Sequence, residues 1–168
     1  IGIISLLLGI SLLTGVLSGS RDILQPLANI NLTSINGNNT NKISALESQH
    51  LVFQRVNSLT EFNKFIAESQ NKYVMLDFYA DWCISCKEME RFTFTDPEVK
   101  NKLKDVVLLQ VDVTEGTTHD EELLKHFKLF GPPGILFFNP YGHEIHDART
   151  IGYRNKEEFL SILNAVLI

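Results

Sequence analysis

Cysteine is scarce in this chain: Cys83 and Cys86 are the only two among 168 residues. A zinc site usually needs four ligands, and no second cysteine pair exists in the sequence to complete one. The five histidines are scattered, and His143 and His146 lie in a predicted turn. We therefore expect no metal and no cofactor other than the cysteine pair itself.

Basic clusters are also missing. The formal net charge is −5, and nucleic-acid binding depends on a concentrated positive surface. We therefore expect no nucleic-acid partner. The hydrophobic content of 44% fits a globular chain, and the residues after the first 50 suffice for one domain with a single core.

Charge is absent from residues 1–17, since Arg21 and Asp22 are the first ionised side chains. This stretch has the minimum length for a membrane span, and we interpret it as the end of a transmembrane helix. The core of a signal peptide is the alternative, because residues 18–20 are small, but no positive segment precedes it. The chain begins at Ile1, so we expect it to be part of a longer protein.

Residues 18–49 are rich in Asn, Ser and Thr and carry no regular apolar pattern, which predicts a flexible linker.

From residue 50 to residue 168 the spacing of apolar residues becomes regular and predicts one domain. Apolar, β-branched runs predict strands at residues 51–56, 73–80, 106–113 and 135–138, with a returning edge strand at about 148–153. Helix starts are predicted at Ser58 with Glu61, after Cys83, at Asp96 before Pro97, at Thr118 with Glu121, and at Asn155 with Glu158. The order βαβαβαββα predicts an α/β fold with a mixed β-sheet flanked by helices on both faces.

The cysteine pair falls where the strand of residues 73–80 gives way to a helix. Cys83 is therefore expected at or near a helix N-terminus, where unpaired N–H groups and the helix dipole favour a thiolate. Cys86 lies one turn further on, close enough to form a disulfide with Cys83. We expect Cys83, nearer the helix end and solvent, to attack, and Cys86 to resolve the mixed disulfide. A purely structural disulfide is the alternative, but so short a loop would stabilise the fold little.

Residues 77–83, Asp-Phe-Tyr-Ala-Asp-Trp-Cys, resemble the segment that leads into the active site of the thioredoxin family. Within it, residues 79–90 followed by Thr-Phe-Thr-Asp-Pro at 93–97 are most similar to the C-terminal domains of the DsbD thiol:disulfide interchange proteins, which are bacterial inner-membrane reductases. The resemblance covers about residues 50–168 and implies a thioredoxin fold. Thioredoxin itself carries Gly-Pro where this chain has Ile84 and Ser85.

Two carboxylates are candidates for tuning the dithiol. Asp77 interrupts an apolar strand, where an ionised carboxylate is costly unless it is paired or hydrated. An outward-facing Asp is possible, but we favour a partly buried functional carboxylate, and the resemblance implies that it assists proton transfer to Cys86. Glu90 is spaced to share a helix face with both cysteines, although a solvated helix charge is the ordinary reading. Together the two carboxylates should disfavour the cysteine thiolate.

Other candidates lie around the dithiol. Trp82 should shape the rim of the site and cover the cysteines. Pro132 and Pro133 precede a strand, and the resemblance implies a cis-proline at Pro133 that lies against the cysteines. The carbonyl of Pro132 should accept a β-like hydrogen bond from a partner peptide. Gly134 departs from the polar or β-branched residue often found there in the family.

The function expected from these features is protein-disulfide reduction. The leading hypothesis is a domain that relays electrons from a membrane-embedded cysteine pair to an N-terminal periplasmic domain of the same reductase and on to protein disulfides. It places the chain in the bacterial inner membrane, tethered through residues 1–17, with residues 50–168 in the periplasm. The alternatives are a stand-alone, membrane-tethered thioredoxin-like reductase, for example in cytochrome c maturation, and a binding module without turnover. The intact Cys83 and Cys86 pair argues against the last of these.

Overall fold

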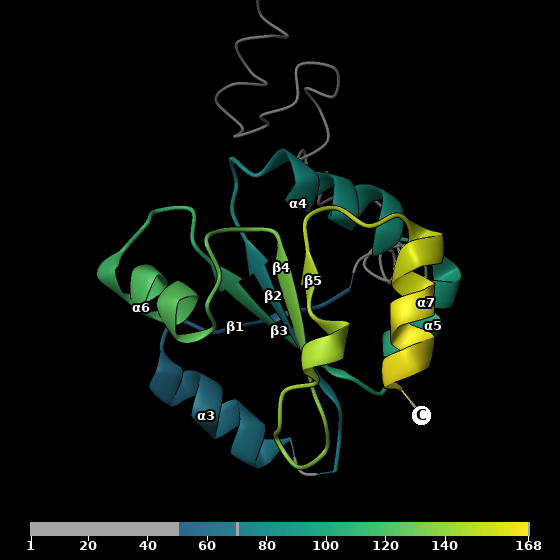
Figure 1. Cartoon of the computed structure of the whole chain (residues 1–168), viewed down its shortest axis with the longest axis horizontal. Coiled ribbons are helices and arrows are strands. Elements are labelled where there is room, and N and C mark those ends of the chain that lie inside the picture. Colours follow the sequence, from purple (N-terminus) through teal and green to yellow (C-terminus); the bar gives the residue numbers. More distant parts are fainter. Residues whose placement is uncertain (1–50, 70, 168) are drawn as a thin grey trace, which may run out of the picture. The chain divides into compact units, whose positions relative to one another are not determined.

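The computed structural model describes residues 51–69 and 71–167. The predicted transmembrane end at residues 1–17 and the predicted linker at residues 18–49 therefore lie outside the described residues. Among the helices of the described part, none is long and apolar enough to cross a bilayer. Figure 1 shows a central sheet with helices on either side of it.

The sheet has five strands in the order β1-β3-β2-β4-β5. They are β1 (Gln54–Arg55), β2 (Val74–Tyr79), β3 (Val107–Asp112), β4 (Gly134–Phe138) and β5 (Thr150–Ile151). β1 and β2 both run parallel to β3, whereas β4 runs antiparallel to its neighbours β2 and β5. The predicted mixed sheet is therefore confirmed. The two edge strands, β1 and β5, are shorter than predicted, at two residues each.

Helices cover both faces of this sheet, as predicted (Figure 1). They are α3 (Leu59–Glu68), α4 (Ile84–Glu88), α5 (Pro97–Leu103), α6 (Thr118–His126) and α7 (Lys156–Val166), with a π-helical turn η1 (Met89–Thr93) and a 3-10 turn η2 (His146–Ala148) that the sequence did not predict. On one face, Phe62 of α3 and Leu123 of α6 share a buried cluster with Phe78. On the other face, Phe159 of α7 shares a second cluster with Met75. β2 supplies both clusters because successive side chains of a strand point to opposite faces.

Helix starts follow the predicted capping residues, with one correction. Ser58 accepts a hydrogen bond from the N–H of Glu61, and Asp96 caps α5 just before Pro97. α6 begins at Thr118 as predicted, but the capping box lies one residue earlier than the predicted pair of Thr118 and Glu121. Its cap is Thr117, whose hydroxyl accepts from the N–H of Asp120 at 3.3 Å while the Asp120 carboxylate accepts from the N–H of Thr117 at 2.7 Å. This reciprocal pair satisfies both donors and leaves Thr118 in the first turn.

The segment after the cysteines is not one continuous α-helix. α4 spans five residues and passes into the wider turn η1, where the N–H of Phe94 reaches the carbonyl of Met89 at 2.8 Å. Thr93 in this turn donates to the carbonyl of Arg154 at 2.7 Å, which ties η1 to the loop before α7. Glu90 is the second residue of η1, so its α-helical spacing from the cysteines stays a prediction.

Candidate active site

The two cysteines lie at the end of the sheet where β2 stops. The N–H of Cys83 bonds to the carbonyl of Ala80 at 3.0 Å, which closes the turn after the strand. Cys83 is the N-cap of α4, and Figure 1 shows this helix across the end of the sheet. Cys83 and Cys86 form a disulfide with a Cα–Cα distance of 5.3 Å. The expectation that the pair is close enough to bond is confirmed.

The two sulfurs differ in hydrogen bonding more than in exposure. Cys83 is 6% exposed and Cys86 is 4% exposed, so closeness to solvent in the oxidised form does not distinguish them. The backbone N–H of Cys86 donates to Sγ of Cys83 at 3.1 Å. Such a donor at a helix N-terminus stabilises negative charge on the sulfur that accepts it. The local geometry therefore favours a thiolate on Cys83.

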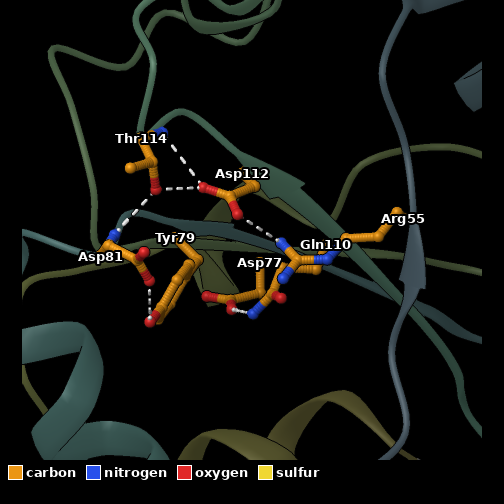
Figure 2. Close-up of polar contacts among 7 residues, drawn as sticks. All are labelled: Arg55, Asp77, Tyr79, Asp81, Gln110, Asp112 and Thr114. Carbon is orange, nitrogen blue, oxygen red and sulfur yellow. Dashed lines mark hydrogen bonds and ion pairs between the residues drawn. The ribbon is translucent and has the colours of Figure 1, made fainter. Parts of the chain in front are cut away.

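Asp77 faces inward from the strand that leads to the dithiol. It is 5% exposed, so the outward-facing alternative does not hold. Its Oδ2 accepts a hydrogen bond of 2.7 Å from Nε2 of Gln110 (Figure 2). Burial raises the pKa of Asp77 to about 7; the Gln110 hydrogen bond and Arg55 lower it, while the charge of Glu90 raises it. This carboxyl group can therefore gain or lose a proton near neutral pH.

Gln110 is the site residue that the sequence analysis missed. It is 4% exposed and lies directly across from Asp77 in the parallel register of β2 and β3. A polar residue inside an otherwise apolar strand was the available signal, and it is the same signal that identified Asp77. Because an amide can donate to a carboxylate and accept from a carboxylic acid, Gln110 can partner either form of Asp77.

Glu90 lies in η1 and is half-buried. Its negative charge raises the pKa of Asp77, so these two carboxylates interact electrostatically. Glu90 thus acts on Asp77 through its charge, while its predicted position beside the two cysteines stays a prediction.

Trp82 directly precedes Cys83, and the residue is 63% exposed. Its indole Nε1 donates to the carbonyl of Thr114 at 3.2 Å, in the loop between β3 and α6. Ile84, on the other side of Cys83, is also exposed. Apolar side chains therefore flank the first cysteine on both sides along the chain.

The loop before β4 contains the cis peptide bond implied at Pro133, between Pro132 and Pro133. The carbonyl of Pro133 accepts from the N–H of Gly152 at 3.1 Å, which joins the loop to the end of β5. Gly134 follows, and a Cβ at this position would lie 2.8 Å from Cδ1 of Leu129. This close packing gives a physical reason for glycine where the family often has a larger residue.

Within residues 51–69 and 71–167, no group of three or more His, Cys, Asp or Glu side chains is arranged to hold a metal ion.

Comparison with known proteins places these features in a family context. A family model described as thioredoxin-like matches residues 60–140. Over 99% of its length the chain is 44% identical to the thiol:disulfide interchange protein DsbD of Ralstonia nicotianae, of which it covers 26%. DsbD of Actinobacillus pleuropneumoniae is 47% identical over 80% of this chain, which corresponds to 23% of that protein. The chain thus spans about a quarter of the length of these relatives.

Solved structures of the same family are similar to this chain. The oxidised C-terminal domain of DsbD from Neisseria meningitidis is 32% identical, with a TM-score of 0.54, and the match covers 74% of this chain and 95% of that domain. Thioredoxin from Fasciola hepatica is 20% identical with a TM-score of 0.53, over 68% of this chain and 99% of that one. The second likeness concerns the fold alone.

Proposed function

This chain belongs to the thioredoxin-like family and, within it, to the C-terminal domains of DsbD proteins, and we propose that it relays electrons from a membrane-embedded cysteine pair to a periplasmic thiol partner. As a member of this family it is a thiol:disulfide oxidoreductase domain. The observation that carries the proposal is the Cys83–Cys86 disulfide at the start of α4, at the end of a strand that holds a buried Asp77.

The chemical step that we assign to the reduced form begins at Cys83. Its thiolate attacks one sulfur of the partner's disulfide, forming a mixed disulfide and releasing the other sulfur as a thiolate, which takes up a proton. Cys86 then loses its proton to the Asp77 carboxylate and attacks Sγ of Cys83. This second exchange closes the Cys83–Cys86 disulfide and releases the partner's remaining sulfur as a thiolate, which takes up a proton, so the partner leaves as a dithiol that has gained two electrons.

Asp77 suits the role of proton acceptor because burial raises its pKa to about 7. A carboxyl group with this pKa is substantially ionised at neutral pH and holds a proton well enough to return it in the reverse reaction. Glu90, whose charge raises that pKa, is assigned a tuning role. The negative charges of Asp77 and Glu90 together destabilise a cysteine thiolate in the reduced form. A dithiol with a less stable thiolate is a better reductant.

The partner is proposed to dock where Trp82 and Ile84 leave apolar surface beside Cys83. The loop at Pro132 and Pro133 is assigned the backbone contact with the partner. Pro132 has no N–H, so only its carbonyl can take part in such a contact, as an acceptor.

The length of the relatives supports a relay over a stand-alone reductase. The DsbD proteins that match this chain are about four times as long, and the match to the Ralstonia nicotianae protein extends over 99% of this chain. We assign the electron source and the recipient to other parts of such a protein, with residues 1–17 as the tether to the bacterial inner membrane and residues 50–168 in the periplasm. Protein disulfides are the final substrates of this route.

A transfer experiment tests the relay. The reduced chain is mixed with the oxidised N-terminal periplasmic domain of the Ralstonia nicotianae relative, and with oxidised glutathione at matched concentration. We expect the second-order rate constant to be at least about a hundredfold larger for the protein partner, because docking converts part of the reaction into an oriented, intramolecular step. Equal rate constants for the two disulfides would argue against the relay while leaving the dithiol chemistry intact.

A further inference from the structure

A closed ring of contacts lies beside the turn that carries the dithiol, and the assigned chemistry does not use it. Figure 2 shows its members, which come from three strands and two connecting loops: Arg55, Tyr79, Asp81, Asp112 and Thr114. Nη1 of Arg55 pairs with Oδ2 of Asp112 at 3.1 Å, at the edge formed by β1 and β3. Oδ1 of the same Asp112 accepts hydrogen bonds from the hydroxyl of Thr114 and, at 3.0 Å, from its backbone N–H.

The ring continues through the turn before Cys83. The N–H of Asp81 donates to the hydroxyl oxygen of Thr114 at 2.8 Å, and the phenol of Tyr79 donates to Oδ1 of Asp81 at 3.0 Å. The guanidinium of Arg55 lies 5.9 Å from the centre of the Tyr79 ring, which closes the circuit with a cation–π contact. The contacts thus return to the residue from which they began.

Thr114 occupies the decisive place in this ring. Its hydroxyl accepts from the N–H of Asp81 and donates to Asp112, so one oxygen links these two residues. Its carbonyl also accepts from the indole of Trp82 at 3.2 Å. The two residues immediately before Cys83 are therefore both fixed to a single residue of the loop between β3 and α6.

The orientation of Cys83 depends on this attachment. Cys83 is the N-cap of α4, so the backbone of Asp81 and Trp82 determines where its sulfur stands relative to the helix end. Thiol–disulfide exchange needs an in-line approach of three sulfurs, and small displacements of an attacking group reduce rates strongly. A turn fixed at two points holds the sulfur in place before a partner arrives.

We propose that Thr114 is a positioning residue for thiol–disulfide exchange, which acts through its contacts with Asp81 and Trp82 to present Cys83 to the incoming disulfide. This inference rests on the dithiol chemistry alone and does not depend on which protein receives the electrons. Two other ring members support this role. Asp112 accepts a hydrogen bond from the Thr114 hydroxyl and orients it, and the Tyr79 phenol donates to the Asp81 carboxylate and holds it in place.

The test uses the full chain with two substitutions at one position and one control. Thr114→Val removes the hydroxyl but keeps the shape of the side chain, whereas Thr114→Ser keeps the hydroxyl. Thr117→Val is the matched control, because it removes a cap hydrogen bond in the same loop without touching the ring. The first readout is the rate constant with which the reduced chain attacks a small aromatic disulfide, 5,5′-dithiobis(2-nitrobenzoate). The second is the fluorescence of Trp82, the only tryptophan in the chain.

We expect Thr114→Val to lower the rate constant about tenfold and to shift the Trp82 emission, since the hydrogen bonds of the hydroxyl with Asp81 and Asp112 are lost. Thr114→Ser and Thr117→Val should stay within about twofold of the wild type. A wild-type rate constant in Thr114→Val, or an equal fall in Thr117→Val, would overturn the proposal.

Tyr79→Phe gives a second test that leaves Thr114 in place, should Thr114→Val fail to fold. It removes the donor to Asp81, and we expect a fall of about threefold in the same rate constant. An unchanged rate constant in this variant would refute the ring as the means of positioning. Because the probe is a small disulfide, failure of the relay would leave all of these comparisons unaffected.

Discussion

Nε2 of Gln110 lies 2.7 Å from Oδ2 of Asp77, across two neighbouring parallel strands and between residues 33 positions apart in the sequence. Both side chains are buried, so water cannot replace this hydrogen bond if it is lost. The amide donates to the carboxylate and thereby lowers a pKa that burial has raised. The protonation state of Asp77 at neutral pH is therefore set by burial and Glu90, which raise its pKa, against Gln110 and Arg55, which lower it.

Replacing Gln110 by leucine should raise the pKa of Asp77 further above about 7, because the remaining effects of burial and of Glu90 both favour the neutral acid. The measurement is a carbon-13 NMR titration of the Asp77 carboxyl in the oxidised chain. Gln54→Leu, at an exposed position of β1, is the control and should leave that titration unchanged. A midpoint in Gln110→Leu at or below the wild-type value would contradict this account.

Stability should depend on pH through Asp77. Its pKa is about 7 in the folded chain against 3.8 for the unfolded reference, so the folded state holds the proton more tightly. The stabilisation is thus complete below about pH 4 and is lost as the pH rises through 7, a loss of about 4 kcal/mol in the free energy of unfolding. Denaturant unfolding of the oxidised chain between pH 4 and 8 should show this slope, and Asp77→Asn should remove it. The control Asp105→Asn, at an exposed position, should keep it.

The cysteine roles can be separated by trapping. Cys86→Ser should accumulate a mixed disulfide between Cys83 and a partner, because the resolving thiol is gone while Cys83 keeps its place at the helix N-terminus. Cys83→Ser should accumulate little. Non-reducing electrophoresis with mass spectrometry identifies the linked residue, and the opposite pattern would reverse the assignment.

Both carboxylates should oppose thiolate formation in the reduced chain. Asp77→Asn and Glu90→Gln each remove a negative charge, so thiolate absorbance should develop at lower pH in either variant than in the wild type. Glu98→Gln, on the exposed side of α5, provides the comparison. Identical absorbance titrations in all four proteins would rule out this coupling.

Gly134 should tolerate no side chain without loss of stability. Gly134→Ala places a Cβ 2.8 Å from Cδ1 of the buried Leu129, and relief of this overlap should cost about 1–2 kcal/mol in the free energy of unfolding. Gly131→Ala is the control, because a Cβ there meets no atom within 4 Å. Chemical denaturation of both variants measures the difference, and similar values for the two would show that Leu129 moves aside freely.

Local features of the chain could be read from the sequence with good fidelity. The position of Cys83 at a helix start, its distance from Cys86, and the caps at Ser58 and Asp96 are confirmed by the structure. Each depends on residues within one or two helical turns, where spacing and side-chain type decide the outcome. The order of strands and helices followed for the same reason.

Positions that depend on exact register were harder to predict. The shift of the α6 cap from Thr118 to Thr117 is decided by which carboxylate reaches back, Asp120 or Glu121. The π-helical turn after Met89 depends on contacts with the distant loop at Arg154. A π-turn amounts to a one-residue insertion into a helix and changes the local free energy little. Packing against a distant segment can therefore determine whether it forms.

The sequence by itself therefore determined the chemistry of this protein: a dithiol at a strand–helix junction, preceded by an acidic residue within an apolar strand. Only the tertiary structure decided which side chains from other parts of the chain lie in contact with these residues. Gln110 reaches Asp77, and Thr114 reaches Asp81, because β2 and β3 lie parallel in one particular register. A shift of that register by one residue would turn Gln110 to the opposite face of the sheet. The register follows from burial on both faces of the whole sheet, and no short stretch of the chain contains that information.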